Sequence, residues 1–596
     1  MWGFLLIREK MHKISEVIIK NFKSCRDTTL LLSEFTPLVG YNNAGKSNCL
    51  SAIQWLIRRA SLSDKDFYDN SQPIEVIATI EGITTQLLNH LPPNQRTSIQ
   101  NYVDNEKLKI RRLQEQPNIR IADVKLYVWD ASIAGWVPNP TGLDNAINAL
   151  LPEPIRIGAM ENAAEDASKA KTTTTIGKLL AEFLEPVKTA HEVELNQHLS
   201  EITSRISCNG NQRFGELANI DQGVNGKVNN LFPGMSVKLH FDTPSIDDLI
   251  KAGTLKVVEG QGADRDFSSY GHGAQRSIQM ALVQYLAEIK RQNNHQTSTT
   301  LLLIDEPELY LHPFAIEQVR EALIELSQNG YQIVISTHSA QMITAEDAEK
   351  TLLIRKDENI GTYSRTRLGD AIQTVVPNST HQMEQLFNLA HSTQLLFAEN
   401  VVLTEGKTEL RLLPFLFKKI ASLTMGQEKH ALVAQSGVND TQKSLAILAK
   451  MDLPTKAICD LDYCFNGAIT HSFLTPNDND IANLKEIFKN IAPIKGISLN
   501  VNTGLPQKNS TISAAKAFEI LACETDAIPL IESLHVKMKA QGIWIWKKGA
   551  IEAHLGTVSK TESEWARFKR DVMSNGLNVT CSDYQGINEL VTWLRS

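Results

Sequence analysis

The first 130 residues alternate apolar with polar positions or run apolar, and they are rich in β-branched side chains. Both patterns are typical of β-strands. We predict strands at residues 14–22, 28–40, 74–82 and 124–130. A helix is predicted to start at a glycine-lysine turn after the second strand and to run through SNCLSAIQWLIRRA.

The pattern changes twice further along the chain. From about residue 150 to 240 it is helical and polar, which predicts either an inserted helical arm that makes dimer contacts or a helical layer of the same domain. Residues 300–313 and 332–339 each begin as an apolar run and end in polar side chains. Such runs are typical of buried parallel strands.

Strands and helices alternate again from residue 395 onward. The predicted strands are NVVLTEG, HALVAQSG, TKAICDLD and GIWIWKKG, with helical segments between them and a helix at the end. This alternation predicts a second α/β domain with its own parallel sheet. The boundary between the two domains is expected between about 370 and 395.

Length and composition narrow the classes of protein that fit this pattern. A chain of 596 residues is too long for one hydrophobic core. The net charge of −7 argues against a protein coated in positive charge, but a local basic groove would suffice to bind DNA. Seven scattered cysteines without a C-x-x-C motif disfavour a zinc site and fit a reducing cytoplasm.

Two further expectations concern the ends and the location of the chain. No apolar run approaches the ~18 residues that a membrane helix needs, so no membrane partner is expected. The short apolar patch at the N-terminus does not fit a signal peptide, and we predict a cytoplasmic protein. Either Met1 or Met11 is the native start.

Residues 40–47, GYNNAGKS, match the phosphate-binding pattern G-x-x-x-x-G-K-[ST] between a predicted strand and a predicted helix. Gly40 and Gly45 would let backbone N–H groups point at the phosphates of ATP. Lys46 would reach the β- and γ-phosphates, and Ser47 would bind Mg²⁺. The predicted nucleotide site also includes Asn42, Asn43 and Asn48.

Acidic residues follow the apolar run LLLI in the segment 300–313. Asp305 would hold the Mg²⁺ of the nucleotide, and Glu306 would polarise the attacking water. His338 ends the next strand and would contact the γ-phosphate, although a lone histidine at such a place is more often structural. These residues complete the motif set of an ATPase.

A glycine-containing stretch, SSYGHGAQRS, precedes another predicted helix. Gly271, Gly273 and Gln275 would present N–H groups at the start of that helix; a plain glycine turn is the alternative. The stretch resembles the signature loop of ABC-type ATPases, which completes the nucleotide site of a partner subunit, although its wording departs from Leu-Ser-Gly-Gly-Gln. A lone subunit has no use for this loop, so we expect a homodimer or a higher oligomer.

Together, these motifs resemble the ATPase heads of the SMC and DNA-repair branch of ABC proteins. YNNAGKSN and DEPELYLHP are typical of that branch. No transmembrane domain is predicted, which disfavours a transporter subunit. No long heptad arm is predicted either, which disfavours an SMC coiled coil.

Carboxylates follow two predicted strands of the second domain. Glu405 ends VVLTEG, and Glu409 follows one helical turn later on the same face. Asp460 and Asp462 end AICDLD, where the period of two in a strand would point both side chains the same way. Four converging carboxylates repel one another, so we predict one or two Mg²⁺ or Mn²⁺ ions among them. Two such ions can clamp the oxygens of a phosphodiester during cleavage.

The order of these acids resembles the Toprim domain of topoisomerases, primases and OLD-family nucleases. An ABC-type ATPase joined to a C-terminal Toprim domain resembles the OLD (overcoming lysogenization defect) family, and KKG-x-IE resembles the closing motif of that family. The resemblance implies that the metal ligands or acid–base residues are Glu405, Glu409, Asp460, Asp462 and Glu552. It implies Lys548 as the phosphate contact, with Lys547 in reserve.

The predicted fold class is therefore α/β: an N-terminal ABC-type P-loop ATPase with an inserted helical dimerisation region, followed by a C-terminal Toprim domain. The predicted bounds are 1–149 and 241–390 for the two parts of the ATPase, 150–240 for the helical insertion and 391–596 for the Toprim nuclease domain.

The resemblance implies a metal-dependent DNA endonuclease that is regulated by ATP binding or hydrolysis and acts in prokaryotic defence against phage. Such a nuclease acts alone, with a UvrD-like helicase, or with a retron reverse transcriptase and its RNA–DNA. ATP would either license or restrain cleavage. An ATP-driven DNA clamp or repair ATPase with a non-catalytic Toprim-like domain is the alternative. A topoisomerase or primase is disfavoured, because Tyr463 is a poor nucleophile candidate and no zinc-binding cysteines are present.

Overall fold

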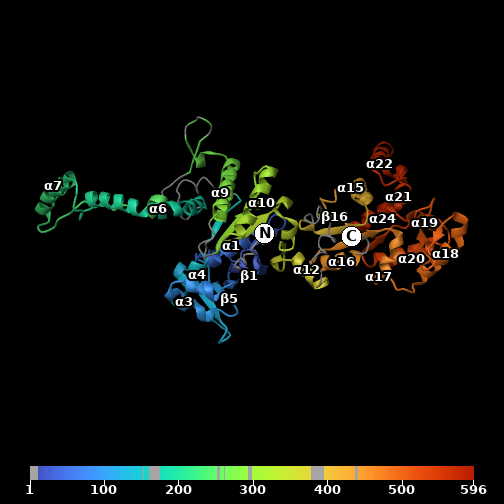
Figure 1. Ribbon diagram of the computed structural model, residues 1–596, viewed down its shortest axis with the longest axis horizontal. Coiled ribbons are helices and arrows are strands. Elements are labelled where there is room, and N and C mark those ends of the chain that lie inside the picture. The colour runs from blue at the N-terminus through green and yellow to red at the C-terminus, as the bar shows by residue number, and fades with distance from the viewer. Residues whose placement is uncertain are drawn as a thin grey trace, which may run out of the picture. The chain divides into compact units, whose positions relative to one another are not determined.

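The chain divides into two compact units (Figure 1). The N-terminal unit comprises Met1–Thr36 and Gly45–Met342, and the C-terminal unit comprises Pro37–Ala44 and Ile343–Ser596. The computed structural model describes residues 11–151, 154–159, 175–251, 255–258, 260, 262, 264–292, 299–377, 395–435 and 440–596. Within these residues no helix is long and apolar enough to cross a membrane. The finer division at 149, 240 and 390 stays a prediction.

Antiparallel strands form the first part of the N-terminal unit. β1 pairs with β2 on one side and with β4 on the other, and β5, β6 and β7 follow in antiparallel order beyond β4. Their bounds are β1 (Lys13–Phe22), β2 (Cys25–Leu31), β4 (Ile74–Glu81), β5 (Lys107–Gln114), β6 (Lys125–Asp130) and β7 (Gly135–Pro138). Helix α1 (Lys46–Ile57) packs against β1 and β4 through an apolar face.

The prediction of one strand over residues 28–40 is wrong. β2 ends at Leu31, and a new strand, β3 (Phe35–Val39), begins after a turn. Ser33 makes this turn, because its backbone N–H donates to Thr36 Oγ1 (2.9 Å) and its hydroxyl donates to the Phe35 carbonyl (2.5 Å). The continuous apolar run concealed this local hydrogen bonding of serine and threonine.

Parallel strands form the second part of the N-terminal unit, as the buried runs predicted. β11 (Thr300–Asp305) pairs in parallel with β12 (Tyr331–Thr337) on one side and with β8 (Ile155–Ile157) on the other. β8 lies inside the segment 150–240 that was predicted to be helical. Helices α9 (His272–Gln292) and α10 (Pro313–Ser327) pack against each other, and their apolar residues share one core with these strands.

A helical arm leaves the N-terminal unit after β8. Its helices are α6 (Thr175–Ile206), α7 (Gly215–Leu231) and α8 (Ile246–Lys251). α6 packs against β8, α8 and α9, and it extends away from them in Figure 1 with α7 at its far end. No residue of α7 is buried, so this helix draws no stability from a core of its own chain.

The C-terminal unit contains a four-stranded parallel sheet in the order β16-β15-β17-β20. Its strands are β15 (Asn400–Thr404), β16 (His430–Ala434), β17 (Thr455–Cys459) and β20 (Ile543–Ile545). In the same unit Leu38 and Val39 of β3 pair in parallel with β13 (Leu352–Asp357), which pairs with β14 (Gly361–Ser364). Most of the predicted domain boundary, 378–394, lies outside the described residues.

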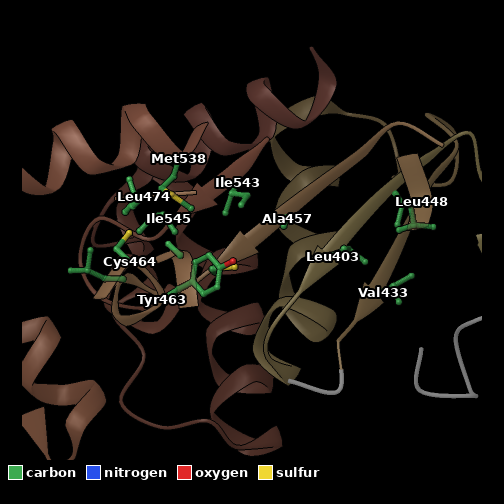
Figure 2. Packing of buried hydrophobic residues seen from close by; sticks show 14 of the residues in the cluster. Leu403, Val433, Leu448, Ala457, Tyr463, Cys464, Leu474, Met538, Ile543 and Ile545 are labelled. Carbon is green, nitrogen blue, oxygen red and sulfur yellow. The ribbon is translucent and has the colours of Figure 1, made fainter. Parts of the chain in front are cut away.

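Alternate residues of the parallel sheet enter two different cores, as the period of two requires. Leu403, Ala457 and Ile543 pack into one core (Figure 2), whereas Val402 and Trp544 pack into the other. The helices of this unit include α15 (Lys407–Ala421), α16 (Thr441–Lys450), α18 (Asn479–Lys495), α19 (Ala514–Leu521), α20 (Ile528–Lys539), α21 (Ile551–Leu555), α22 (Glu562–Asn575) and α24 (Tyr584–Arg595). Because β15, β17 and β20 are parallel neighbours, their carboxyl ends meet at one edge of the sheet.

Candidate functional site

The predicted phosphate-binding loop has a backbone that requires its glycines. A Cβ at Gly40 would lie 2.3 Å from the Ile354 carbonyl oxygen. Gly45, immediately before α1, has φ +105°, which favours glycine. Asn43 has φ +66°, a conformation that asparagine tolerates better than most residues. The sequence pattern G-x-x-x-x-G thus reflects steric needs of this loop.

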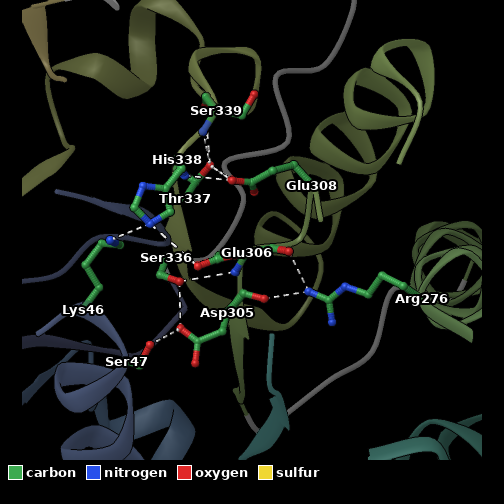
Figure 3. A network of polar contacts seen from close by, with 10 residues as sticks. All are labelled: Lys46, Ser47, Arg276, Asp305, Glu306, Glu308, Ser336, Thr337, His338 and Ser339. Atoms are coloured by element: carbon green, nitrogen blue, oxygen red, sulfur yellow. Dashed lines mark hydrogen bonds and ion pairs between the residues drawn. The ribbon is translucent and has the colours of Figure 1, made fainter. Parts of the chain in front are cut away.

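Lys46, Glu306 and His338 converge in the N-terminal unit (Figure 3). Lys46 Nζ donates to His338 Nε2 at 2.9 Å, and the Glu306 carboxylate lies 3.6 Å from the same nitrogen. Burial, reinforced by the charge of Lys46, lowers the pKa of His338. The imidazole is therefore neutral and accepts the hydrogen bond from the lysine.

Asp305, the last residue of β11, is buried and has three partners in the N-terminal unit. Its Oδ1 accepts hydrogen bonds from Ser47 Oγ (3.0 Å) and Ser336 Oγ (2.7 Å) (Figure 3). Its Oδ2 forms an ion pair with Arg156 of β8. Sequence reasoning missed Arg156, because a single arginine in a three-residue strand has no pattern of its own.

Arg276 of α9 holds the backbone next to Asp305. Its Nη2 donates to the carbonyl oxygens of Asp305 (2.6 Å) and Glu306 (2.8 Å), and its Nη1 donates to the Gly158 carbonyl (3.1 Å). Glu306 has φ +48°, a left-handed conformation that is unfavourable for glutamate. The buried guanidinium fastens this kink and so fixes the direction of the Glu306 side chain.

Glu308 is a second acid that the sequence analysis did not single out. Its Oε1 accepts hydrogen bonds from the backbone N–H of His338 (2.7 Å) and from Thr337 Oγ1 (2.8 Å). Burial raises the pKa of Glu308. This carboxyl anchors the end of β12 and with it the position of His338.

The predicted signature loop begins helix α9. Gly271 precedes the helix, while Gly273 and Gln275 lie in its first turn. The side chain of Gln275 is buried and donates to the Tyr270 carbonyl (2.7 Å). A Cβ at Gly271 would meet nothing within 4 Å, and one at Gly273 would be 3.7 Å from Tyr310 Cβ. Packing against the described residues therefore does not require glycine at these two positions.

The second candidate site lies at the carboxyl edge of the parallel sheet in the C-terminal unit. Glu405 follows β15, and Asp460 follows the neighbouring strand β17. Carboxylate oxygens of Glu405, Asp460 and Asp462 all lie within 4.8 Å of one another. Asp462 was predicted to lie in a strand, and this prediction is wrong. β17 ends at Cys459, and residues 461–465 form a 3₁₀-helix. This turn, rather than the period of two, brings Asp462 beside Asp460.

Burial and mutual repulsion disfavour the charged state of these acids. Burial, together with the charge of Asp462, raises the pKa of Glu405 to about 7. The pKa of Asp460 is raised well above its ordinary value by burial and by the charges of Glu405 and Glu409. Burial also raises the pKa of Asp462. A nearby positive charge would therefore stabilise the ionised form of these carboxyl groups.

Glu409 and Glu552 lie next to this triad. Trp546 Nε1 donates to Glu409 Oε1 (3.1 Å), and Thr408 Oγ1 donates to Glu552 Oε1 (2.6 Å). Both carboxyls are buried, and burial raises the pKa of Glu409, with the charge of Glu552 adding to the effect. We call these two acids and the triad the carboxylate cluster: Glu405, Glu409, Asp460, Asp462 and Glu552.

The lysine that reaches the carboxylate cluster is Lys560, between α21 and α22. Its Nζ lies 3.5 Å from Glu552 Oε2 and 4.0 Å from Asp460 Oδ2. Burial lowers the pKa of Lys560, but the charges of Asp460 and Glu552 outweigh this effect and the pKa is raised. The sequence analysis missed Lys560, because a single lysine in a polar loop has no distinctive pattern. It selected Lys547 and Lys548 of the KKG turn instead.

The two lysines of the KKG turn have partners of their own. Lys547 Nζ lies 3.0 Å from Glu532 and 3.5 Å from Glu589, and Lys548 Nζ lies 3.8 Å from Asp583. The structure therefore does not bring either lysine to the carboxylate cluster through these contacts. The role of Lys548 as a phosphate contact stays a prediction.

The two sites define an ATPase joined to a Toprim domain. Residues 12–129 and 94–343 match the family described as an AAA ATPase domain. Residues 396–462 match the TOPRIM domain of proteins like the overcoming lysogenization defect protein.

Three relatives extend these matches along the chain. The Old nuclease of Escherichia phage P2 is 40% identical over 591 residues, which cover 98% of this chain and 100% of that protein. The OLD nuclease of Thermus scotoductus is 24% identical over 74% of this chain and 81% of its own length. Endonuclease GajA of Bacillus cereus strain VD045 is 22% identical over 68% and 67%. The chain belongs to the OLD nuclease family, and the predicted family and α/β fold class are confirmed.

Proposed function

We propose that this protein is a metal-dependent DNA endonuclease whose activity is regulated by ATP. The observation that carries the proposal is the triad Glu405, Asp460 and Asp462, whose carboxylate oxygens lie within 4.8 Å of one another at adjacent strand ends. In a Toprim domain of a nuclease family, such a triad fits phosphodiester cleavage better than a structural role. Endonuclease GajA supports internal cleavage of a nucleic acid, and DNA is the substrate that we propose.

The donor set of the carboxylate cluster fits Mg²⁺ or Mn²⁺. These ions prefer oxygen ligands, and a divalent ion would relieve the repulsion that raises the pKa values of Glu405 and Asp460. Glu405, Asp460 and Asp462 would hold the metal, with Glu409 and Glu552 as further ligands or acid–base groups. The metal supplies Lewis acidity toward the phosphodiester and lowers the pKa of a coordinated water.

Lys560 gains a role in this proposal that the sequence analysis gave to Lys548. Its ammonium group lies against Asp460 and Glu552, and its side chain is 58% exposed. From this position it would hold charge on the phosphate oxygens of a bound strand while it limits repulsion among the acids.

The N-terminal unit is proposed to bind and hydrolyse ATP. Lys46 and the backbone of the phosphate-binding loop would hold the phosphates, and Ser47 and Asp305 would bind Mg²⁺. Glu306 would orient the attacking water, and His338 would contact the γ-phosphate. The network in Figure 3 supports these roles, since Asp305, Glu306 and His338 are each fixed by hydrogen bonds.

A homodimer is part of the proposal. Among the described residues, Gly271 and Gly273 have room for a side chain, which fits a signature loop whose glycines allow the close approach of a partner subunit's nucleotide. On α7, Ile220, Val224 and Leu231 are exposed at helical spacing. These residues support the arm as a dimer contact.

The biological setting stays a set of predictions. Defence against phage, a UvrD-like helicase partner, a retron reverse transcriptase partner and a cytoplasmic location all derive from the family resemblance. ATP would either license cleavage or restrain it, and both senses of control are compatible with the two units.

The test is cleavage of supercoiled plasmid by the purified chain with Mg²⁺ or Mn²⁺, with and without ATP. We expect cutting that requires the metal and is lost in Asp460→Ala. Asp526→Ala, an exposed acid outside the carboxylate cluster, is the matched control and should cut normally. Lys46→Ala then reveals the sense of ATP control.

Two outcomes would contradict the proposal. Cutting that persists in Asp460→Ala would place the nuclease activity elsewhere or in a contaminant. Intact ATP hydrolysis without cutting of supercoiled, linear or single-stranded DNA under any metal condition would favour the ATP-driven clamp.

A further inference from the structure

Helix α15 exposes a row of positive charges that begins beside the carboxylate cluster. Lys407, Arg411 and Lys418 are exposed and lie four and seven residues apart, so they share one face of the helix. The single acid of the helix, Glu409, is buried and turned to the carboxylate cluster. With Lys419, the helix carries four positive charges and one buried acid, in a chain of net charge −7.

Helix α22 extends this surface sideways. α15 and α22 pack against each other in the C-terminal unit. Their contact brings Lys419 Nζ of α15 and Lys569 Nζ of α22 to 5.8 and 5.9 Å from the centre of the Phe415 ring. Arg570 follows Lys569 and is exposed. We call this surface the cationic face: Lys407, Arg411, Lys418, Lys419, Lys569 and Arg570.

Most charges of the cationic face have no carboxylate partner among the described residues. Within the described residues, Lys407, Lys418, Lys419, Lys569 and Arg570 make no ion pair with a carboxylate. Arg411 is the exception, with Glu562 at 2.9 Å. Ordinary solvated helix faces intersperse both signs, as the neighbouring Arg567 does with Glu564 and Asp571. The excess of positive charge on α15, with Lys569 and Arg570 of α22 beside it, fits a polyanionic partner better than water alone.

The cationic face and the carboxylate cluster adjoin along the chain. Lys407 follows Glu405 by two residues, and Lys560, which contacts Asp460 and Glu552, lies two residues before α22. Lys407 and Lys418 are eleven residues apart, which is about 16 Å along a helix. Since phosphates of one DNA strand rise by about 3.4 Å each, this row spans about five nucleotides of a duplex.

We propose that the cationic face binds the sugar–phosphate backbone of DNA that flanks the cleavage point, and that it holds the duplex so that one strand reaches the carboxylate cluster. The proposal rests on the nuclease function proposed above and adds the surface by which the substrate is held. Lysine and arginine on an exposed face read charge, not sequence, so binding through it is independent of sequence and weakens with salt.

The test measures binding of a 30-base-pair duplex as a function of KCl concentration, in an Asp460→Asn background that prevents cutting. The face variant combines Lys407→Gln, Lys418→Gln and Lys569→Gln. The control variant combines Lys450→Gln, Lys489→Gln and Lys508→Gln, which removes three lysines of other elements and so changes the net charge equally.

We expect the slope of log affinity against log salt to become shallower by about 2 to 3 in the face variant, since each lost phosphate contact accounts for about 0.9. The control variant should keep the parent slope. Equal slopes in all three chains, or equal losses in the two variants, would overturn the proposal.

A second measurement separates this proposal from the nuclease function itself. In the chain with Asp460 intact, the face variant should cut plasmid at least about tenfold more slowly, yet hydrolyse bis(p-nitrophenyl) phosphate with Mn²⁺ at the parent rate, because a small diester needs no flanking contacts. An equal loss on the small diester would place these lysines in the chemistry and overturn the docking role. If Asp460→Asn left plasmid cutting unchanged, the nuclease site would fail, while the salt slopes would still decide the cationic face.

Discussion

The nucleotide site and the carboxylate cluster solve the same electrostatic problem in opposite ways. Both place acids at the carboxyl ends of buried parallel strands. Asp305 in the nucleotide site has Arg156, Ser47 and Ser336 as partners. In the carboxylate cluster of five acids, the ion pairs among the described residues come from Lys560, which contacts Asp460 and Glu552.

This difference indicates that the carboxylate cluster, more than the nucleotide site, depends on a cation from outside the protein. Positive charge and donors from the protein already balance Asp305, so that strand end is stable in the chain alone. In the carboxylate cluster, burial and repulsion raise the pKa values of Glu405, Glu409 and Asp460, and burial raises that of Asp462. A bound metal ion would offset the unfavourable burial and repulsion of these carboxylates, which the protein's own side chains do not fully compensate.

The largest effect expected is on cleavage. Asp460→Asn should lower the rate of plasmid cutting by about 10³-fold, because one metal-holding carboxylate at the centre of the triad is lost. ATP hydrolysis should stay within about twofold, since the nucleotide site is built from other strands. Parallel assays of plasmid cutting and phosphate release check this. A loss of both activities would break the separation of the two sites.

The second prediction concerns the balanced site. Asp305→Asn removes the negative charge that Arg156 faces in a buried ion pair, which typically costs about 3 kcal/mol of stability. Calorimetry of the N-terminal unit's transition in EDTA should show a lower melting temperature. Asp66→Asn, which changes a capping-box acid of the same unit, serves as the comparison and should cost less. An unchanged melting temperature in Asp305→Asn would contradict the balance inferred here.

Lys560 and Lys548 offer a direct comparison of structure with sequence. Lys560→Gln should slow plasmid cutting by about 10- to 100-fold, because its ammonium group lies against Asp460 and Glu552. Lys548→Gln should have a smaller effect, because Lys548 faces Asp583. Single-turnover cutting with saturating enzyme checks the chemical step. A larger loss in Lys548→Gln would restore the interpretation made from the KKG motif.

Arg276 should act on the rate of ATP hydrolysis and not on ATP binding. A lysine lacks the planar fork by which Nη1 and Nη2 of Arg276 reach carbonyls on two segments, so Arg276→Lys should lower kcat about tenfold and leave KM within about twofold. Partial rescue of Arg276→Ala by free guanidinium would show that the donors themselves position Glu306. Arg120→Lys, an exposed arginine of the same unit, should behave as the parent. Equal changes in kcat and KM would point to general loss of the fold.

Much of the fold and of both sites could be predicted, because motif residues follow apolar strands. The run LLLIDE places Asp305 at a strand end whatever the rest of the chain does. Lys560 and Arg156 could not be found in this way, since tertiary contacts alone bring them to their sites. Asp462 was placed correctly in the acid cluster for the wrong reason, because a 3₁₀-turn replaced the expected strand. Sequence periodicity reports which face a side chain occupies, but not where the element ends.

The smallest expected effect is a change in stability. Neutralising one acid should destabilise the nucleotide site but stabilise the metal-free carboxylate cluster, so this change tests the comparison of the two sites. Asp462→Asn removes a negative charge from a group of acids that repel one another, so the metal-free C-terminal unit should gain stability, by only about 0.5 kcal/mol because Asp462 is exposed to solvent. Calorimetry in EDTA measures this gain, and addition of Mn²⁺ should cancel it, because the variant binds the metal less well than the parent. Asp526→Asn, exposed and outside the cluster, should change neither value. A loss of stability in Asp462→Asn without metal would mean that Lys560 already balances the cluster, and the need for an external cation would fall with it.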